Sequence, residues 1–386
     1  MTKELTTVHM ISFNVPYPAN YGGVIDVFYQ LKALSNLNVK VILHCFEYGR
    51  KQAQELEQFC QKVYYYKRKT GLLSQLSRLP YIVYSRRSKI LLNNLLKDNF
   101  PILFQGTHCC HLLNHQQFKS RVKIVRLHNV EWKYYQSLFL QEKNWIKKLY
   151  FKLESTKLKR FEEQLVVKYA DHIFSISTNE TSYLKTFNPK NLEYQPAFHS
   201  NEEIISKIGY GEYILYHGDL SVKDNENACL FLMDEIFSKL KLKLVLAGLN
   251  PGPLLLNKVK HVMNVEIKAN LTNNEMESLI QNAHINILIS FNNAGMKLKL
   301  LNALYKGRHC LANQAIIENT GLEELCYIKD LPKDIIVKIQ DLMNTEFTEL
   351  EIQKRKELLY QTSFSNVTNA RKTLNILANR SNLHQS

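Results

Sequence analysis

The sequence predicts an α/β fold with two doubly wound parallel sheets in tandem, and three observations indicate it. Short apolar or β-branched runs alternate with longer segments of helical period, which is typical of βαβ units. The same alternation starts again after residue 200. A chain of 386 residues, 45% of them hydrophobic, is also long enough for two cores of ordinary size. We expect a first domain over residues 1–205 and a second over residues 206–386, with the break close to Gly209 and Gly211.

Apolar runs give the expected strands in chain order. In the first domain they are VHMISF, VKVILHCF, PILFQG, VKIVRLH and HIFSIS, and VIDVFYQLKAL has the helical period between the first two runs. In the second domain they are YILYHGDL, LKLVLAGL, HINILIS and RHCLANQ, separated by the helical segments NACLFLMDEIFSKL, NNEMESLIQNA and GMKLKLLNALYKG. The tail from Asp334 to Ser386 predicts two further helices.

Charge and cysteine content narrow the class of protein. The formal net charge of +15 predicts an acidic partner, which is nucleic acid, anionic lipid or a phosphorylated small molecule. No helix-turn-helix, RRM or zinc signature accompanies the charge, so we expect no nucleic acid. The seven cysteines show no CxxC pair and no metal-ligand spacing. We interpret them as buried thiols in a reducing cytoplasm, and expect no membrane span because no long apolar run and no signal-peptide pattern occur.

Candidate residues follow the strands of the first domain, because ligands of open α/β sheets bind beyond the carboxyl ends of the strands. Gly22 and Gly23 lead into a helix and expose backbone N–H groups to an anion, although a tight turn that needs glycine explains them equally well. His108 follows the third strand, where a lone histidine is more often structural. His128 and Asn129 end the next strand. A helix N-cap explains Asn129 without a function, whereas His128 is not needed for a cap and is the better candidate.

Two loops of the second domain hold further candidates. Gly218 permits close backbone approach after the first strand, and Lys223 precedes a helix, where an ordinary surface lysine is an equally good interpretation. Near the end of this domain, FNNAGMKLKLLNALYKG places Lys297 and Lys299 in the first turn of a helix. The helix dipole makes that end positive, so a cation there costs a few tenths of a kcal/mol to about 1 kcal/mol unless an anion accompanies it. The position therefore predicts an anionic ligand.

The same helix carries a narrow polar stripe of Lys299, Asn302 and Lys306, spaced three and four residues apart. We expect Lys299 and Asn302 to face one ligand, with Gly295 allowing the ligand to approach the free N–H groups. The alternative is an ordinary solvent stripe on an amphipathic helix. The apolar remainder of the helix consists of Met296, Leu298, Leu300, Leu301, Ala303, Leu304 and Tyr305.

These stretches resemble one family. AGMKLKLLNALYKGRHCLANQ looks like the sugar-nucleotide motif of GT-B glycosyltransferases of the group 1, or family 4, type. NVPYPANYGGVIDVFYQLKAL, RLHNVEWKYY and YHGDLSVKDNENA are similar to the N-terminal glycine loop, the histidine loop and the second-domain phosphate loop of that family. The resemblance extends over nearly the full length and includes the HNxE, YHGxLS and GxKLKLLNAL signatures of a bacterial group. It implies two Rossmann-like domains facing a central cleft, with a nucleotide-sugar donor on the second domain and an acceptor on the first.

The resemblance also implies a role for each candidate residue. His128 would lie near the transferred sugar, and Lys223 and Lys299 would neutralise the diphosphate leaving group, which makes these three the expected catalytic residues. Asn302 would meet the ribose. The remaining expected donor-binding residues are Gly22, Gly23, Gly218, Gly295, Met296 and Lys297.

One departure from the family leaves the activity open. The family usually has two glutamates eight positions apart in the helix motif, and here Ala294 and Asn302 occupy those positions. An asparagine accepts with one oxygen only, which weakens a contact to two ribose hydroxyls. The leading interpretation is a retaining, metal-independent glycosyltransferase of bacterial cell-surface polysaccharide synthesis with a glycan or lipid-linked acceptor. The alternatives are a catalytically inactive GT-B-like partner in a glycan-assembly complex and a nucleotide-sugar epimerase, the last disfavoured because no carboxylate-rich site is visible.

A basic segment predicts contact with an anionic membrane. Residues 62–97 interleave basic side chains with tyrosine and leucine and contain no acid, a pattern that fits binding in the plane of the inner face of the cell membrane. A second basic run, KNWIKKLYFKLESTKLKR, has the same character, but lysines that are solvated over an apolar core explain it equally well. The basic residues of the first segment are Lys62, Lys67, Arg68, Lys69, Arg78, Arg86, Arg87, Lys89 and Lys97.

Overall fold

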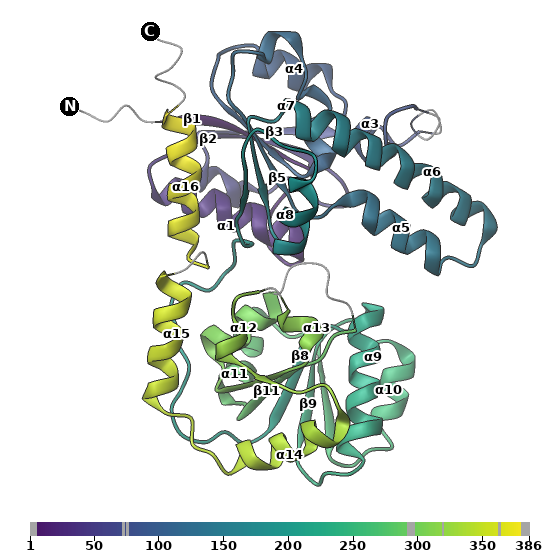
Figure 1. Ribbon diagram of the computed structural model, residues 1–386, viewed down its shortest axis with the longest axis vertical. Helices are drawn as coiled ribbons and strands as arrows, with labels where there is room; N and C mark the ends of the chain where they lie inside the picture. The colour runs from purple at the N-terminus through teal and green to yellow at the C-terminus, as the bar shows by residue number, and fades with distance from the viewer. Residues whose placement is uncertain are drawn as a thin grey trace. The chain divides into compact units, whose positions relative to one another are not determined.

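The computed structural model describes residues 6–71, 74, 77–291, 298–318, 320–361 and 364–379, and it divides into two compact units. The first unit comprises Met1–Ser200 and Ser363–Ser386, and the second comprises Asn201–Thr362 (Figure 1). This division differs from the predicted one, which gave the whole tail to the second domain. The C-terminal residues instead return to the first unit.

The first unit is built on a seven-stranded parallel sheet in the order β3-β2-β1-β4-β5-β6-β7. The chain direction across the sheet reverses between β1 and β4, so the carboxyl ends of these strands form a topological switch point, where ligands bind in folds of this kind. The strands are β1 Thr7–Ser12, β2 Lys40–Glu47, β3 Lys62–Lys67, β4 Ile102–Gln105, β5 Lys123–Leu127, β6 His172–Ser175 and β7 Leu192–Tyr194.

Helices cover the first sheet, and apolar side chains from them complete two cores. One core includes residues of α1 and α16, and the other includes residues of α4 and α6. The α-helices are α1 Gly22–Asn36, α3 Tyr81–Tyr84, α4 Lys89–Leu95, α5 Glu131–Gln141, α6 Trp145–Phe161, α7 Val167–Tyr169, α8 Thr178–Lys185 and α16 Asn366–Asn379. The 3₁₀-helices are η1 Gln54–Phe59, η2 Thr107–Leu112 and η3 Gln116–Phe118, and η4 Glu162–Val166 is a π-helix.

Specific contacts explain why α16 belongs to the first unit. Ala370 and Leu377 are fully buried in the core that α1 lines. The Gln195 side chain donates to the Asn369 carbonyl at 3.1 Å, and Lys372 pairs with Glu193 at 2.7 Å. A pattern of apolar residues in the tail predicts a helix, but it does not reveal which core the helix covers.

The second unit has a six-stranded parallel sheet in the order β10-β9-β8-β11-β12-β13, with its switch point between β8 and β11. The strands are β8 Ile214–Asp219, β9 Leu244–Leu249, β10 Val265–Ala269, β11 Ile285–Leu288, β12 His309–Ala312 and β13 Tyr327–Ile328. The α-helices are α9 Lys223–Phe231, α10 Pro253–Val259, α11 Asn273–Asn282, α12 Leu298–Lys306, α13 Gln314–Ile317, α14 Pro332–Met343 and α15 Glu349–Gln361. A π-helix, η5 Leu232–Phe237, and a 3₁₀-helix, η6 Glu323–Leu325, complete the unit.

The basic segment 62–97 does not form the single amphipathic element that the sequence suggested. Its described residues form β3, α3 and α4, and Arg86 is only 3% exposed. The Arg86 guanidinium donates to the Phe13 carbonyl at 2.9 Å and to the Ile82 carbonyl at 2.7 Å. Burial lowers the pKa of Arg86 to about 10. The predicted membrane role of Arg86 is therefore wrong, because this side chain holds the loop after β1 inside the unit. Within the described ranges, no helix is long and apolar enough to cross a bilayer.

Candidate functional site

A fully buried ion pair organises the switch point of the first unit. Arg126, in β5, donates to Asp26, in α1, from Nε to Oδ2 at 2.6 Å and from Nη2 to Oδ1 at 2.8 Å. The Phe198 N–H also donates to Oδ1 of Asp26 at 2.6 Å, and Arg126 Nη1 donates to the Gln195 side chain at 2.6 Å. Buried charges are tolerated when they are paired and hydrogen-bonded in this way. The pair ties α1 to β5 beneath the candidate histidine.

His128 lies directly on this pair. Its Nδ1 is 3.2 Å from Oδ2 of Asp26, and its Nε2 is 3.1 Å from Oε1 of Gln105 at the end of β4. Gln105 in turn donates to the Gln30 side chain at 2.6 Å. Burial lowers the pKa of His128 to about 4, although the Asp26 carboxylate opposes that shift. His128 is therefore a neutral, oriented hydrogen-bonding group at neutral pH.

Two buried carboxyl groups lie next to the histidine loop. Glu131 is the first residue of α5, and its backbone N–H donates to Glu162 Oε1 at 3.0 Å. His108 Nδ1 lies 4.0 Å from Glu131 Oε1. Burial raises the pKa of Glu131 to about 8 and that of Glu162 to about 7, and for Glu131 the Glu162 charge adds to the effect. In the sequence, Glu131 stands out only as the last position of the HNxE signature, with no role assigned to it. Its position three residues after His128 was the available signal.

These carboxyl groups predict a specific pH dependence. A carboxyl whose pKa is raised in the folded state binds more protons there than in the unfolded chain, so the free energy of unfolding falls as pH rises from about 4.5 to about 8. Glu131→Gln removes this term. We therefore expect the free energy of unfolding to fall less in the variant than in the wild type when the pH is raised from 5 to 8. Urea unfolding of both proteins at the two pH values measures this difference. In the control Glu57→Gln, which changes an exposed carboxyl, the loss of stability between pH 5 and pH 8 should equal that of the wild type. If both variants change this loss equally, the buried Glu131 carboxyl is not its source.

The predicted glycines of the first unit lie at the start of α1. The helix begins at Gly22, and the side chain of the preceding Tyr21 does not cap it. A Cβ atom on Gly23 would lie 2.7 Å from the ring of Phe13, so a larger residue at this position would displace that ring. Gly23 lies inside α1, so the structure gives no support to the tight turn that the sequence suggested. Binding of an anion by either glycine stays a prediction.

Lys299 occupies the switch point of the second unit. It is the second residue of α12, and its Nζ donates to Asn225 Oδ1 at 3.0 Å and to Tyr216 OH at 3.3 Å. The Ile289 carbonyl, just beyond β11, lies 3.5 Å from the same atom. Burial lowers the pKa of the neighbouring His217 to about 3, with a further contribution from the Lys299 charge. The structure thus brings the predicted cation to the carboxyl ends of β8 and β11.

Asn225, in α9, is the residue that sequence reasoning missed here. Its Oδ1 accepts from Tyr216 OH at 3.0 Å and from Lys299, while its Nδ2 donates to the Asp219 carbonyl at 2.8 Å. A Cβ atom on Gly218 would lie 3.1 Å from the Asn225 amide nitrogen, so the glycine leaves room for the Asn225 side chain. In sequence, Asn225 belongs to a polar helix start, and nothing distinguishes it from its neighbours.

The remaining predicted residues are not gathered around Lys299. Lys223 is 70% exposed and pairs with Glu226 at 2.7 Å. Asn302 is half-buried, and its Oδ1 accepts from Asn201 at 2.9 Å. Lys306 forms an ion pair with Glu277 on α11, so the members of the polar stripe contact different partners.

The start of the predicted helix motif lies outside the residues that the structure describes. Ala294, Gly295, Met296 and Lys297 lie outside the described residues. The predicted apolar face is confirmed for Leu300, Leu301, Ala303, Leu304 and Tyr305, which are buried. Within the described part of the chain, no three His, Cys, Asp or Glu side chains are grouped closely enough to hold a metal ion.

Comparison with known proteins identifies the fold. No family model matches the chain. A 44.6 kDa protein of Klebsiella pneumoniae, described as uncharacterized and as lying in the cps region, is 23% identical over 341 residues, which cover 82% of this chain and 85% of that protein.

Solved structures of similar architecture span nearly the whole chain. A glycosyltransferase of Rickettsia africae superposes with a TM-score of 0.64 at 12% identity, covering 98% of this chain and 99% of that one. A variant of S. aureus TarM, in complex with fondaparinux, alpha-GlcNAc-glycerol and UDP, gives a TM-score of 0.61 at 9% identity, covering 97% and 100%. The chain therefore has the GT-B fold of two Rossmann-like α/β domains, which confirms the predicted fold class.

Proposed function

We propose that the protein is a glycosyltransferase that moves a sugar from a nucleotide-sugar donor to a glycan or lipid-linked acceptor in bacterial cell-surface polysaccharide synthesis. The observation that carries the proposal is Lys299, a cation in the first turn of α12 that Asn225 and Tyr216 hold at the switch point of the second sheet. The UDP present in the TarM complex and the cps-region position of the Klebsiella relative support it. We place the enzyme in the cytoplasm, at the inner face of the cell membrane.

The chemistry of this proposal needs stabilisation of a leaving phosphate. Cleavage of the bond between sugar and diphosphate builds negative charge on the phosphate oxygen. Lys299 is preorganised by its hydrogen bonds, and the dipole of α12 adds partial positive charge at the start of the helix. Transfer in this proposal is independent of metal and retains the anomeric configuration. Lys223 is paired with Glu226 in this structure, so in this proposal it exchanges that partner for the donor phosphate.

The first unit supplies hydrogen bonds and shape in this proposal. His128 is neutral, and its two ring nitrogens face Asp26 and Gln105, so in this proposal it contributes the shape of the site beside the transferred sugar. Glu131 holds its proton at neutral pH and is suited to donate it. The donor contacts are proposed for Gly22, Gly23, Gly218, Gly295, Met296, Lys297 and Asn302.

A thermal-shift panel tests the proposed donor class. UDP-, GDP-, ADP- and CMP-sugars are each added at millimolar concentration, and the unfolding temperature is recorded. A ligand at one hundred times its dissociation constant stabilises the folded state by about 2.7 kcal/mol. We expect one nucleotide base to raise the unfolding temperature clearly above the others. No shift with any of the four would contradict a nucleotide-sugar site.

A catalytically inactive GT-B protein is the second candidate, and Asn302 favours it. If Asn302 meets the ribose, Asn302→Glu should retain or raise the affinity for the nucleoside diphosphate, because a carboxylate accepts from two hydroxyl groups at once. The glutamate side chain should still accept the hydrogen bond that Asn201 donates to residue 302, so the variant should fold. The length-matched control Asn302→Gln has one acceptor oxygen and should not gain affinity by calorimetry. A folded Glu variant that has lost all binding would show that residue 302 does not face the ribose.

A further inference from the structure

The helices α5 and α6 form an ordered hairpin with an unusually apolar tip. They pack side by side and extend away from the sheet of the first unit (Figure 1). Asn144 fixes the turn, because its Oδ1 accepts from the N–H groups of Ile146 at 3.0 Å and Lys147 at 3.2 Å. Five large apolar side chains at the tip and along the first half of α6 are between 50% and 74% exposed, namely Leu140, Trp145, Ile146, Leu149 and Leu153. An apolar cluster of this kind marks a binding surface.

Positive charge surrounds that cluster. Lys143, Lys147 and Lys152 are exposed beside it, and Lys148 lies over the Phe139 ring at 5.3 Å. Glu142 is the only acid among residues 142–153. Solvated lysines over an apolar core explain the lysines of this helix but not the exposed tryptophan and leucines. Tryptophan and leucine flanked by lysine are typical of segments that lie in the interface of an anionic membrane.

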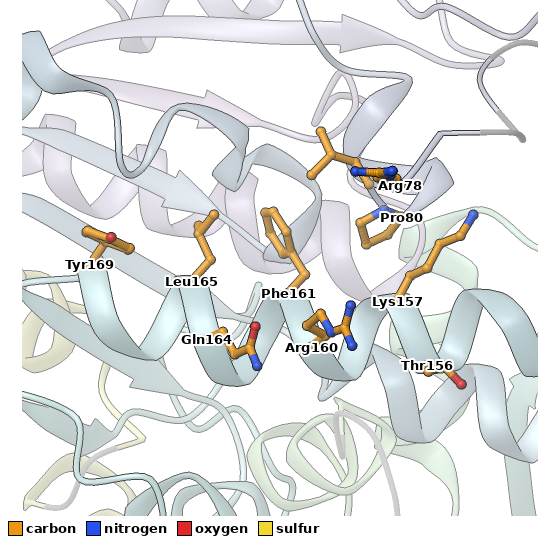
Figure 2. A pocket seen from close by; sticks show the side chains of 10 residues that line it. Arg78, Pro80, Thr156, Lys157, Arg160, Phe161, Gln164, Leu165 and Tyr169 are labelled. Atoms are coloured by element: carbon orange, nitrogen blue, oxygen red, sulfur yellow. The ribbon is translucent and has the colours of Figure 1, made fainter.

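The same face of α6 leads to a basic groove. Trp145, Leu149, Leu153, Thr156 and Arg160 follow at spacings of four, four, three and four residues, so they share one side of the helix. At its far end lies a groove of about 350 Å³. Figure 2 shows Phe161, Leu165 and Tyr169 on one side of the helical stretch α6–η4–α7, with Arg78 and Pro80 on that side near Phe161.

The groove combines an apolar floor with a cationic rim. Leu79, Phe161 and Leu165 provide apolar surface, and Arg78, Lys157 and Arg160 provide the rim. Lys157 is paired with Glu154 at 2.8 Å. The guanidinium groups of Arg78 and Arg160 form no ion pair or hydrogen bond with any residue that the structure describes. Two uncompensated guanidinium groups beside aliphatic carbon suit a phosphate attached to a lipid chain.

We propose that this continuous surface, from the hairpin tip to the groove, binds an anionic phospholipid bilayer. The tip inserts its apolar side chains at the interface, and the groove receives the phosphate of one lipid. The proposal rests on the proposed function in that it names the surface through which such an enzyme meets a membrane-held acceptor. It also replaces segment 62–97 as the principal membrane contact, since Arg86 is buried and Arg78 is the one basic residue of that segment that lines the groove.

Vesicle co-sedimentation without any donor tests the surface, so its outcome is independent of transferase activity. The full chain is mixed with vesicles of phosphatidylglycerol and phosphatidylcholine, or of phosphatidylcholine alone. We expect binding to the anionic vesicles only, and at least a tenfold loss for the tip variant Trp145→Ser/Ile146→Ser/Leu149→Ser. The matched control Leu254→Ser/Leu256→Ser removes exposed apolar side chains from α10 and should bind like the wild type.

Variants that remove positive charge distinguish lipid binding in the groove from general attraction of the basic protein to an anionic vesicle. Arg78→Gln/Arg160→Gln should weaken binding to anionic vesicles about tenfold and reduce its salt dependence, whereas the exposed pair Lys241→Gln/Lys260→Gln should have little effect. Unfolding temperatures equal to that of the wild type verify that each variant is folded. Tip and groove variants that bind like the wild type would overturn the proposal. A wild type that sediments as a dimer and a tip variant that sediments as a monomer would also overturn it, because the surface would then bind a second copy of the chain.

Discussion

Lys299→Ala is expected to weaken nucleoside diphosphate binding at least tenfold, whereas Lys306→Ala on the same helix should change it less than about threefold. A charge-assisted hydrogen bond contributes about 1.5–3 kcal/mol, which corresponds to a factor of roughly ten to one hundred or more. Lys299 lies in the first turn of α12, at the switch point of the sheet, where the N–H groups reinforce its charge. Lys306 lies in the last turn and is already paired with Glu277.

Isothermal titration calorimetry with UDP, GDP and ADP measures this difference. The unfolding temperature of each variant without ligand serves as the control for folding. Equal losses in the two variants would mean that the anion is attracted by the overall charge of the unit and not by the start of α12. A loss confined to Lys306→Ala would place the ligand elsewhere.

Asp26→Ala should destabilise the first unit by about 3–5 kcal/mol, because it leaves the buried Arg126 without its carboxylate partner. Urea unfolding measures the loss. Arg126→Met in the Asp26→Ala background should recover part of it, because the second change removes the unpaired charge. If the double variant is as unstable as the sum of the single variants, the ion pair is not the cause.

The same pair gives a pH dependence of definite sign. Burial alone raises the pKa of Asp26, but the Arg126 charge and hydrogen bonds outweigh burial, so the pKa lies below its ordinary value. A carboxyl with a lowered pKa contributes stability that is present above the unfolded-state pKa near 4 and is lost as pH falls through the folded-state value. Asp26→Ala should therefore be less sensitive than the wild type to acid below about pH 4.

The accuracy of the sequence-based fold prediction follows from burial. Every interior strand of both sheets was expected from its apolar run, because strands covered on both faces are almost continuously apolar. The four strands that were not expected are β3, β7, β10 and β13, and these are the outermost strands of the two sheets. Edge strands are half-exposed and carry polar residues, so their sequences resemble loops. This is why KVYYYK was interpreted as part of a membrane-binding segment.

The candidate site was predictable where a local rule applies. The helix dipole makes a lysine in a first turn conspicuous, and Lys299 was found in this way. Asp26 and Arg126 lie 100 residues apart and each interrupts an apolar run. A charge inside an apolar run indicates a buried pair, but sequence alone does not identify the partner. Asn225 carries no such signal, because its role depends on Gly218 and Lys299 meeting it in space.

Transfer of a radiolabelled sugar tests the proposed function most directly. The protein is incubated with each labelled nucleotide-sugar and a lipid extract of bacterial membranes, and the label in the lipid and polysaccharide fractions is counted. The proposed function predicts incorporation from one donor by the wild type, and at least a tenfold reduction by Lys299→Ala at a donor concentration below saturation. Binding of a nucleotide-sugar by the wild type without incorporation from any donor would contradict it, and would favour the inactive GT-B-like partner protein.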